Sequence, residues 1–101
     1  MRLEAKQVEI LGRVVRQHFG EKTRLLLFGS RLDDQAKGGD IDLYLEPEIT
    51  KGQALARALI KTRAALSQQL GEQKIDLVIH CPGQPLLPIH QHAQTTGVPI
   101  E

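Results

Sequence analysis

Two short apolar runs joined by a polar loop constrain the fold of this chain more than any other feature of its sequence. The first run covers residues 25–28 and ends in a Gly-Ser pair, and the second covers residues 40–46. In the second run, apolar and polar residues alternate, which is typical of a β-strand because successive side chains point to opposite faces. Asp40 and Asp42 therefore project from one face of the predicted strand. Two neighbouring carboxylates repel each other unless a cation lies between them, so the pattern predicts a divalent-metal site.

The rest of the chain contains further helices and strands. Apolar spacing and the positions of glycine and proline predict three helices and four strands. In order, they are helix 3–19, strand 24–28, strand 40–46, helix 50–70, strand 74–80, helix 86–96 and strand 98–100. Thr50 and Gln53 have the spacing of a capping box at the start of the second helix. This order predicts an α/β (α+β) fold, with helices covering a small mixed sheet in a single domain, residues 1–101.

The composition narrows the classes of function. The chain has 101 residues, 41% of them hydrophobic, and a net charge of +1, which is typical of a soluble globular protein. It has no basic stripe and few aromatic side chains on which bases could stack, so nothing indicates nucleic-acid binding. No apolar stretch approaches the ~20 residues of a membrane helix. The N-terminus lacks the apolar core of a signal peptide, and the lone Cys81 fits a reducing compartment, so we expect a cytoplasmic protein without membrane contact.

Asp76 is a third acidic residue of interest. It lies in the middle of the otherwise apolar strand predicted over residues 74–80, where an unpaired charge would be costly. If this strand pairs beside the strand that carries Asp40 and Asp42, the three carboxylates can hold one or two hard cations such as Mg²⁺. Pairing of Asp76 with a nearby lysine or arginine is an alternative that the residues leave open.

The turn after the first apolar run supplies the other half of such a site. Gly29 lets the backbone approach a ligand closely, and the N–H groups that follow it, with the Ser30 hydroxyl, can hold phosphate oxygens. Arg31 and Lys37, in the following loop, can neutralise charge on a triphosphate. A simpler interpretation is that Ser30 only caps the turn and that the two cations are solvated loop charges.

These motifs together resemble those of a known family. The segment Phe28-Gly29-Ser30-Arg31, followed after the loop by Asp40-Ile41-Asp42-Leu43, is similar to the signature of the nucleotidyltransferase (DNA polymerase β-like) superfamily. A later strand acid, Asp76, extends the resemblance. The length of the chain and its terminal Gly97-Val98 are most similar to the minimal nucleotidyltransferases of this superfamily.

The resemblance implies a reaction and assigns residues to it. The implied reaction moves AMP from ATP to an acceptor hydroxyl and releases pyrophosphate. The implied catalytic and metal-binding residues, which would hold one or two Mg²⁺ ions, are Asp40, Asp42 and Asp76. The residues implied to contact the phosphates of ATP are Gly29, Ser30 and Arg31.

The resemblance also implies a partner. Minimal nucleotidyltransferases are often encoded beside a small helical HEPN-type protein, and some act as antitoxins by modifying a tyrosine of that ribonuclease. We therefore expect a HEPN-type partner and a homo- or hetero-oligomer. The loop acids Asp33 and Asp34 favour a second hypothesis, in which a binding module of the same fold neutralises its partner by occlusion. A third hypothesis is transfer to a small hydroxyl compound such as an aminoglycoside.

Four residues near the C-terminus raise the question of zinc: His80, Cys81, His90 and His92. Residues two apart on a helix point ~200° apart, so His90 and His92 cannot share one site. We therefore interpret the histidines as part of a polar surface near a turn, and Cys81 as a buried or indifferent small residue.

Overall fold

The computed structural model describes residues 4–29, 41–71 and 73–101. These residues form three helices and four strands. In chain order they are α1 (Ala5–Phe19), β1 (Arg24–Phe28), β2 (Ile41–Glu46), α2 (Gly52–Leu70), β3 (Ile75–Ile79), α3 (Pro88–Thr96) and β4 (Val98–Pro99). The predicted α+β class is confirmed, and so is the predicted order of helices and strands.

The strands form one mixed sheet in the order β3-β2-β1-β4. β1 is antiparallel to both β2 and β4, whereas β2 and β3 are parallel. The third strand therefore pairs beside the second, which is the condition for Asp76 to lie near the acids of that strand. A parallel pair needs a long connection, and α2 provides it by crossing from the end of β2 to the start of β3.

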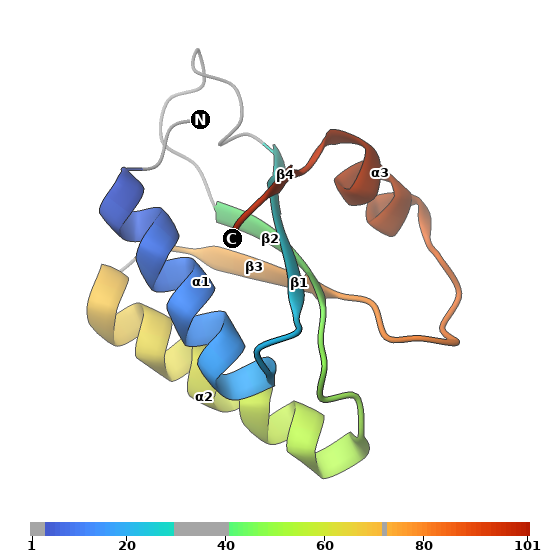
Figure 1. Cartoon of the computed structure of the whole chain (residues 1–101), viewed down its shortest axis with the longest axis horizontal. Coiled ribbons are helices and arrows are strands. Elements are labelled where there is room, and N and C mark those ends of the chain that lie inside the picture. Colours follow the sequence, from blue (N-terminus) through green and yellow to red (C-terminus); the bar gives the residue numbers. More distant parts are fainter. Residues whose placement is uncertain (1–3, 30–40, 72) are drawn as a thin grey trace.

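Helices cover both faces of this sheet (Figure 1). α1 and α2 lie side by side over one face and α3 lies over the other. Because side chains alternate along each strand, each face has its own core. The fully buried strand residues on the face of α1 and α2 are Leu25, Leu27, Ile41, Leu43 and Leu45. The smaller core beneath α3 contains Leu26, Phe28, Tyr44 and Ala93.

All three helices begin later than the sequence pattern predicts, and α1 begins at Ala5 instead of residue 3. Lys51 is the N-cap residue of α2 and makes no side-chain capping bond, so the predicted capping box of Thr50 and Gln53 is wrong. Thr50 lies before the cap, and Gln53 is the second helical residue rather than the third. α3 begins at Pro88 instead of residue 86, because proline has no N–H to lose and its fixed φ suits the first helical turn.

None of the helices within residues 4–29, 41–71 and 73–101 is long and apolar enough to cross a membrane.

Candidate functional site

Asp42 and Asp76 are direct partners across neighbouring strands. Their Cα atoms are paired in the parallel register of β2 and β3, and adjacent strands lie roughly 4.8 Å apart. Paired residues of a parallel ladder point to the same face, so both carboxylates lie on the face that α3 partly covers. Both residues are half-buried. Two of the three predicted acids are therefore brought together, and Asp40 lies outside the described residues.

Gly29 is the third described member of this site. It follows β1 directly and has a φ of +83°, a left-handed conformation that L side chains rarely adopt. A Cβ atom at this position would overlap the carboxylate of Asp42. Glycine is therefore required here for its backbone conformation and also for the space that it leaves. The other predicted phosphate-binding residues, Ser30 and Arg31, lie outside the described residues.

The described acids are of the chemical type that binds a hard divalent cation. Asp42 and Asp76 offer carboxylate oxygens from two rigid neighbouring strands, and such oxygens are the ligands that Mg²⁺ prefers. In the described ranges, no three His, Cys, Asp or Glu side chains gather in a way that could hold a metal. The third predicted ligand, Asp40, lies outside those ranges. The described metal-binding candidates are therefore Asp42 and Asp76.

A buried polar network lies beside the acids. Tyr44 is fully buried two residues after Asp42, and its hydroxyl donates a 2.6 Å hydrogen bond to Glu46 Oε2. The Gln94 side-chain amide of α3 contacts the Tyr44 hydroxyl at 2.9 Å and Glu46 Oε2 at 3.2 Å. Arg24 lies 3.3 Å from the same carboxylate oxygen. These bonds attach α3 to β2 next to the acids.

The network shifts the pKa values of its two titratable groups, the Tyr44 phenol and the Glu46 carboxylate. Burial, and then the hydrogen bond to Glu46, raise the pKa of the Tyr44 phenol above its ordinary value. Burial alone would raise the pKa of Glu46, but the hydrogen bond from Tyr44 and the charge of Arg24 together lower it. Our reading of the sequence missed this network. The available signal was the strand alternation, which places Tyr44 on the same face as Asp42, and a buried tyrosine usually finds a hydrogen-bond partner.

The histidines contribute to the docking of α3. His90 is only 8% exposed, and its Nδ1 accepts the backbone N–H of Leu87 at 3.0 Å. Its ring lies 4.8 Å from that of His80, measured between centroids. His92 is exposed and meets Phe28 edge-on. The interpretation as a polar surface therefore fits His92 but is wrong for His90, which is a buried helix-capping residue.

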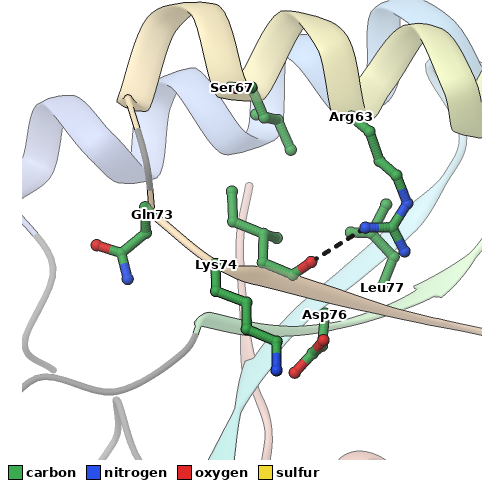
Figure 2. A pocket seen from close by; sticks show the side chains of 8 residues that line it. Arg63, Ser67, Gln73, Lys74, Asp76 and Leu77 are labelled. Atoms are coloured by element: carbon green, nitrogen blue, oxygen red, sulfur yellow. Dashed lines mark hydrogen bonds between the residues drawn. The ribbon is translucent and has the colours of Figure 1, made fainter.

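A hollow of about 280 Å³ lies along the outer edge of β3, between that strand and α2. Figure 2 shows Arg63 and Ser67 reaching it from α2 and Gln73 from the segment before β3. Arg63 Nη1 donates a 3.3 Å hydrogen bond to the carbonyl oxygen of Ile75. Lys74 and Asp76 extend to the same side of the chain, so a lysine neighbour for Asp76, the alternative reading of this acid, is compatible with the structure.

No protein-family model matches the chain, and the search of curated proteins gave no match. The functional interpretation therefore rests on the arrangement of the chain's own residues, above all Gly29, Asp42 and Asp76.

Proposed function

We propose that the protein is a Mg²⁺-dependent nucleotidyltransferase that moves AMP from ATP to a hydroxyl group. One observation carries the proposal. The carboxylate of Asp42 fits into the space left by the missing side chain of Gly29, and Asp76 is its register partner on the next strand. A turn glycine thus contacts one strand acid, and a second acid is paired beside the first on the next strand, which supports the proposal.

In this proposal the acids bind the cation, and the Gly-Ser turn orients the triphosphate. Asp42 and Asp76, with Asp40 of the same motif, would hold Mg²⁺, which supplies charge stabilisation at the phosphates. The N–H groups after Gly29 and the Ser30 hydroxyl are assigned to the phosphates by sequence alone. Most of the rate enhancement would come from positioning and from fixed charges rather than from a covalent enzyme intermediate.

The transfer is a single displacement at phosphorus. The acceptor oxygen forms a bond to the α-phosphorus of ATP, and the bond from that phosphorus to the bridging oxygen of pyrophosphate breaks. Pyrophosphate leaves with the bonding electron pair. The proton of the acceptor hydroxyl passes to a carboxylate of the site, for which Asp76 is the candidate base.

The sequence resemblance extends the proposal to the acceptor. On that ground the acceptor is a tyrosine of a HEPN-type toxin encoded beside this chain, and the protein acts as its antitoxin. A second candidate is a binding module of the same fold that blocks a partner without catalysis. The loop acids Asp33 and Asp34 favour this second candidate, because negative charge near a triphosphate weakens its binding.

The test uses ATP labelled at the α-phosphate, Mg²⁺ and the HEPN-type protein of the neighbouring gene. We expect labelled partner, and we expect Asp42→Asn and Asp76→Asn to abolish labelling. Glu9→Gln, which changes an exposed acid on α1, should leave labelling unchanged. Labelling that survives Asp42→Asn, or wild-type protein that transfers no label, overturns the proposal. Full neutralisation of the partner by Asp42→Asn identifies the binding module instead.

A further inference from the structure

Strand β3 carries one acid of the site and is also an edge of the sheet. Within the described residues it pairs on one side only, with β2. The Lys74 carbonyl accepts a hydrogen bond from Ile41 N–H, and His80 N–H donates one to the Leu45 carbonyl, each at 3.0 Å. In a parallel ladder, alternate residues direct their backbone groups toward the partner strand. The even-numbered residues of this segment therefore face β2, and Ile75, Leu77 and Ile79 direct N–H and C=O outward.

This outer edge is partly exposed and only partly occupied. All five residues of β3 are half-buried rather than buried. Arg63 already bonds the carbonyl oxygen of Ile75. Among the described residues no such bond reaches the outward groups of Leu77 or Ile79. An open row of backbone donors and acceptors is a template for one more strand.

A strand added at this edge would continue the row of acids. Asp42 and Asp76 are adjacent across β2 and β3, so the next place in the row lies on the added strand, roughly 4.8 Å beyond β3. The residue at that place would point to the same face as the two carboxylates. A serine, threonine or tyrosine there would bring its hydroxyl to the acid pair.

The positive charge beside the edge of β3 indicates that the added strand carries acidic residues. Arg63 and Lys74 line the hollow next to β3, together with the polar side chains of Ser67 and Gln73 (Figure 2). α2, which contributes Arg63, contains no aspartate or glutamate in its 19 residues. Residues that flank the hydroxyl residue on an extended strand point to the opposite face, which is the face of α2. Glutamate or aspartate at those flanking places would lie near Arg63.

We propose that the outer edge of β3 docks the acceptor, as an extended acidic segment of a protein that adds one strand to the sheet and presents its hydroxyl beside Asp76. The proposal rests on the proposed nucleotidyl transfer and names its substrate as an extended, hydroxyl-bearing peptide. In the docked segment the hydroxyl oxygen bonds the α-phosphorus of ATP. Pyrophosphate leaves with the electron pair of the broken bond, and the hydroxyl proton passes to Asp76.

The first experiment measures docking without catalysis. The probe is a synthetic peptide with a central Glu-Tyr-Glu sequence between threonines, added to the full-length protein without ATP. We expect slowed hydrogen exchange at the backbone amides of Leu77 and Ile79. N-methylation of those peptide amides that bond the edge should abolish binding, and N-methylation of the alternate amides should not. Protection confined to other segments, or equal binding by both methylated peptides, overturns the proposal.

Charge reversal on α2 gives a matched pair of variants. Arg63→Glu should weaken peptide binding about tenfold, because it replaces a cation at the edge with an anion. Arg57→Glu makes the same change on the same helix, in a hollow shared with α1 rather than with β3, and should change binding less than about twofold. Equal effects of the two variants would contradict docking at this edge.

The two proposals fail in different ways. Peptide that protects Leu77 and Ile79 but never accepts label from ATP supports the docking site and overturns the proposed transfer. Label transfer to the peptide without protection of β3 supports the transfer and overturns the docking site. Protection of the β3 amides that rises with protein concentration in the absence of peptide shows pairing between two copies of the chain, and it also overturns docking of the acceptor.

Discussion

The carboxylate of Asp42 occupies the space that a Cβ atom at Gly29 would fill. This contact joins the end of β1 to the start of β2, which are neighbours in the sheet through the pair Phe28 and Asp42. Gly29 therefore has two roles: it adopts the left-handed backbone conformation of the turn, and it leaves space for the carboxylate of Asp42.

Replacement of that glycine tests the contact. Gly29→Ala should displace the Asp42 carboxylate and weaken Mn²⁺ binding by about tenfold or more, which is the range seen when the support of a metal ligand is removed. The measurement is Mn²⁺ titration followed by the broadening of amide signals. Gly71→Ala is the control, because Gly71 also has a positive φ, +76°, but has nothing within 4 Å of its Cβ position. Both variants should lose about 1–2 kcal/mol of stability from backbone strain, and equal Mn²⁺ binding by the two would contradict the role of Gly29.

Tyr44 offers a direct measurement, because it is the only tyrosine and the chain has no tryptophan. Its pKa is raised, so the midpoint of the absorbance change of phenol ionisation should lie above the ordinary value of 10.0. A raised pKa in the folded state contributes stability that is present below pH 10.0 and is lost as the pH rises through the folded value. Glu46→Gln removes the neighbouring charge and should lower the midpoint of the titration without returning it to 10.0, since burial remains. An unchanged midpoint in this variant would show that Glu46 does not act on the phenol.

Glu46 should make the fold sensitive to acid. Its lowered pKa means that it contributes stability above its ordinary value of 4.5, and that this stability is lost as the pH falls through the lower folded value. Tyr44→Phe removes the hydrogen-bond donor and should destabilise the protein by about 1 kcal/mol at neutral pH. Urea unfolding between roughly pH 3 and 6 should show a shallower acid loss for Tyr44→Phe than for the wild type. Parallel pH profiles for the two proteins would argue against this linkage.

Thr62 offers a way to stabilise the protein. It is fully buried in α2, and within the described part of the chain its Oγ1 has no hydrogen-bond partner. Thr62→Val keeps the shape of the side chain and removes the unsatisfied hydroxyl, so the free energy of unfolding should rise by about 1 kcal/mol or more. Thr62→Ser keeps the hydroxyl and loses the methyl group, and it should be less stable than the wild type. Chemical denaturation of the three proteins checks both expectations, and a destabilised Thr62→Val would mean that the hydroxyl is satisfied in solution.

Local periodicity was enough to predict most of the elements. β1 has the predicted bounds of residues 24–28, and α2 ends at Leu70 before Gly71, as predicted. These features depend on neighbouring residues alone, and the spacing of apolar side chains therefore reveals them.

The features that the sequence reading missed depend on contacts between distant segments. The overlap between Gly29 and Asp42 follows from the antiparallel register of two strands. The bond from Gln94 to Tyr44 follows from the placement of α3 over the sheet. The same placement buries His90, so its interpretation as a surface residue was wrong. Spacing along a chain does not specify how two segments approach each other.

The alternation of β2 has a consequence for how the protein tolerates change. A slip of one residue in this strand would turn Asp42 and Tyr44 into the apolar layer beneath α1 and α2, and would move Leu43 out of that layer to the face of α3. The free-energy penalty for such a slip comes from the disrupted packing of the core and not from the site itself. The packing of the core therefore also fixes the face on which the acids lie. A folded molecule with the wrong strand register should be too rare to detect.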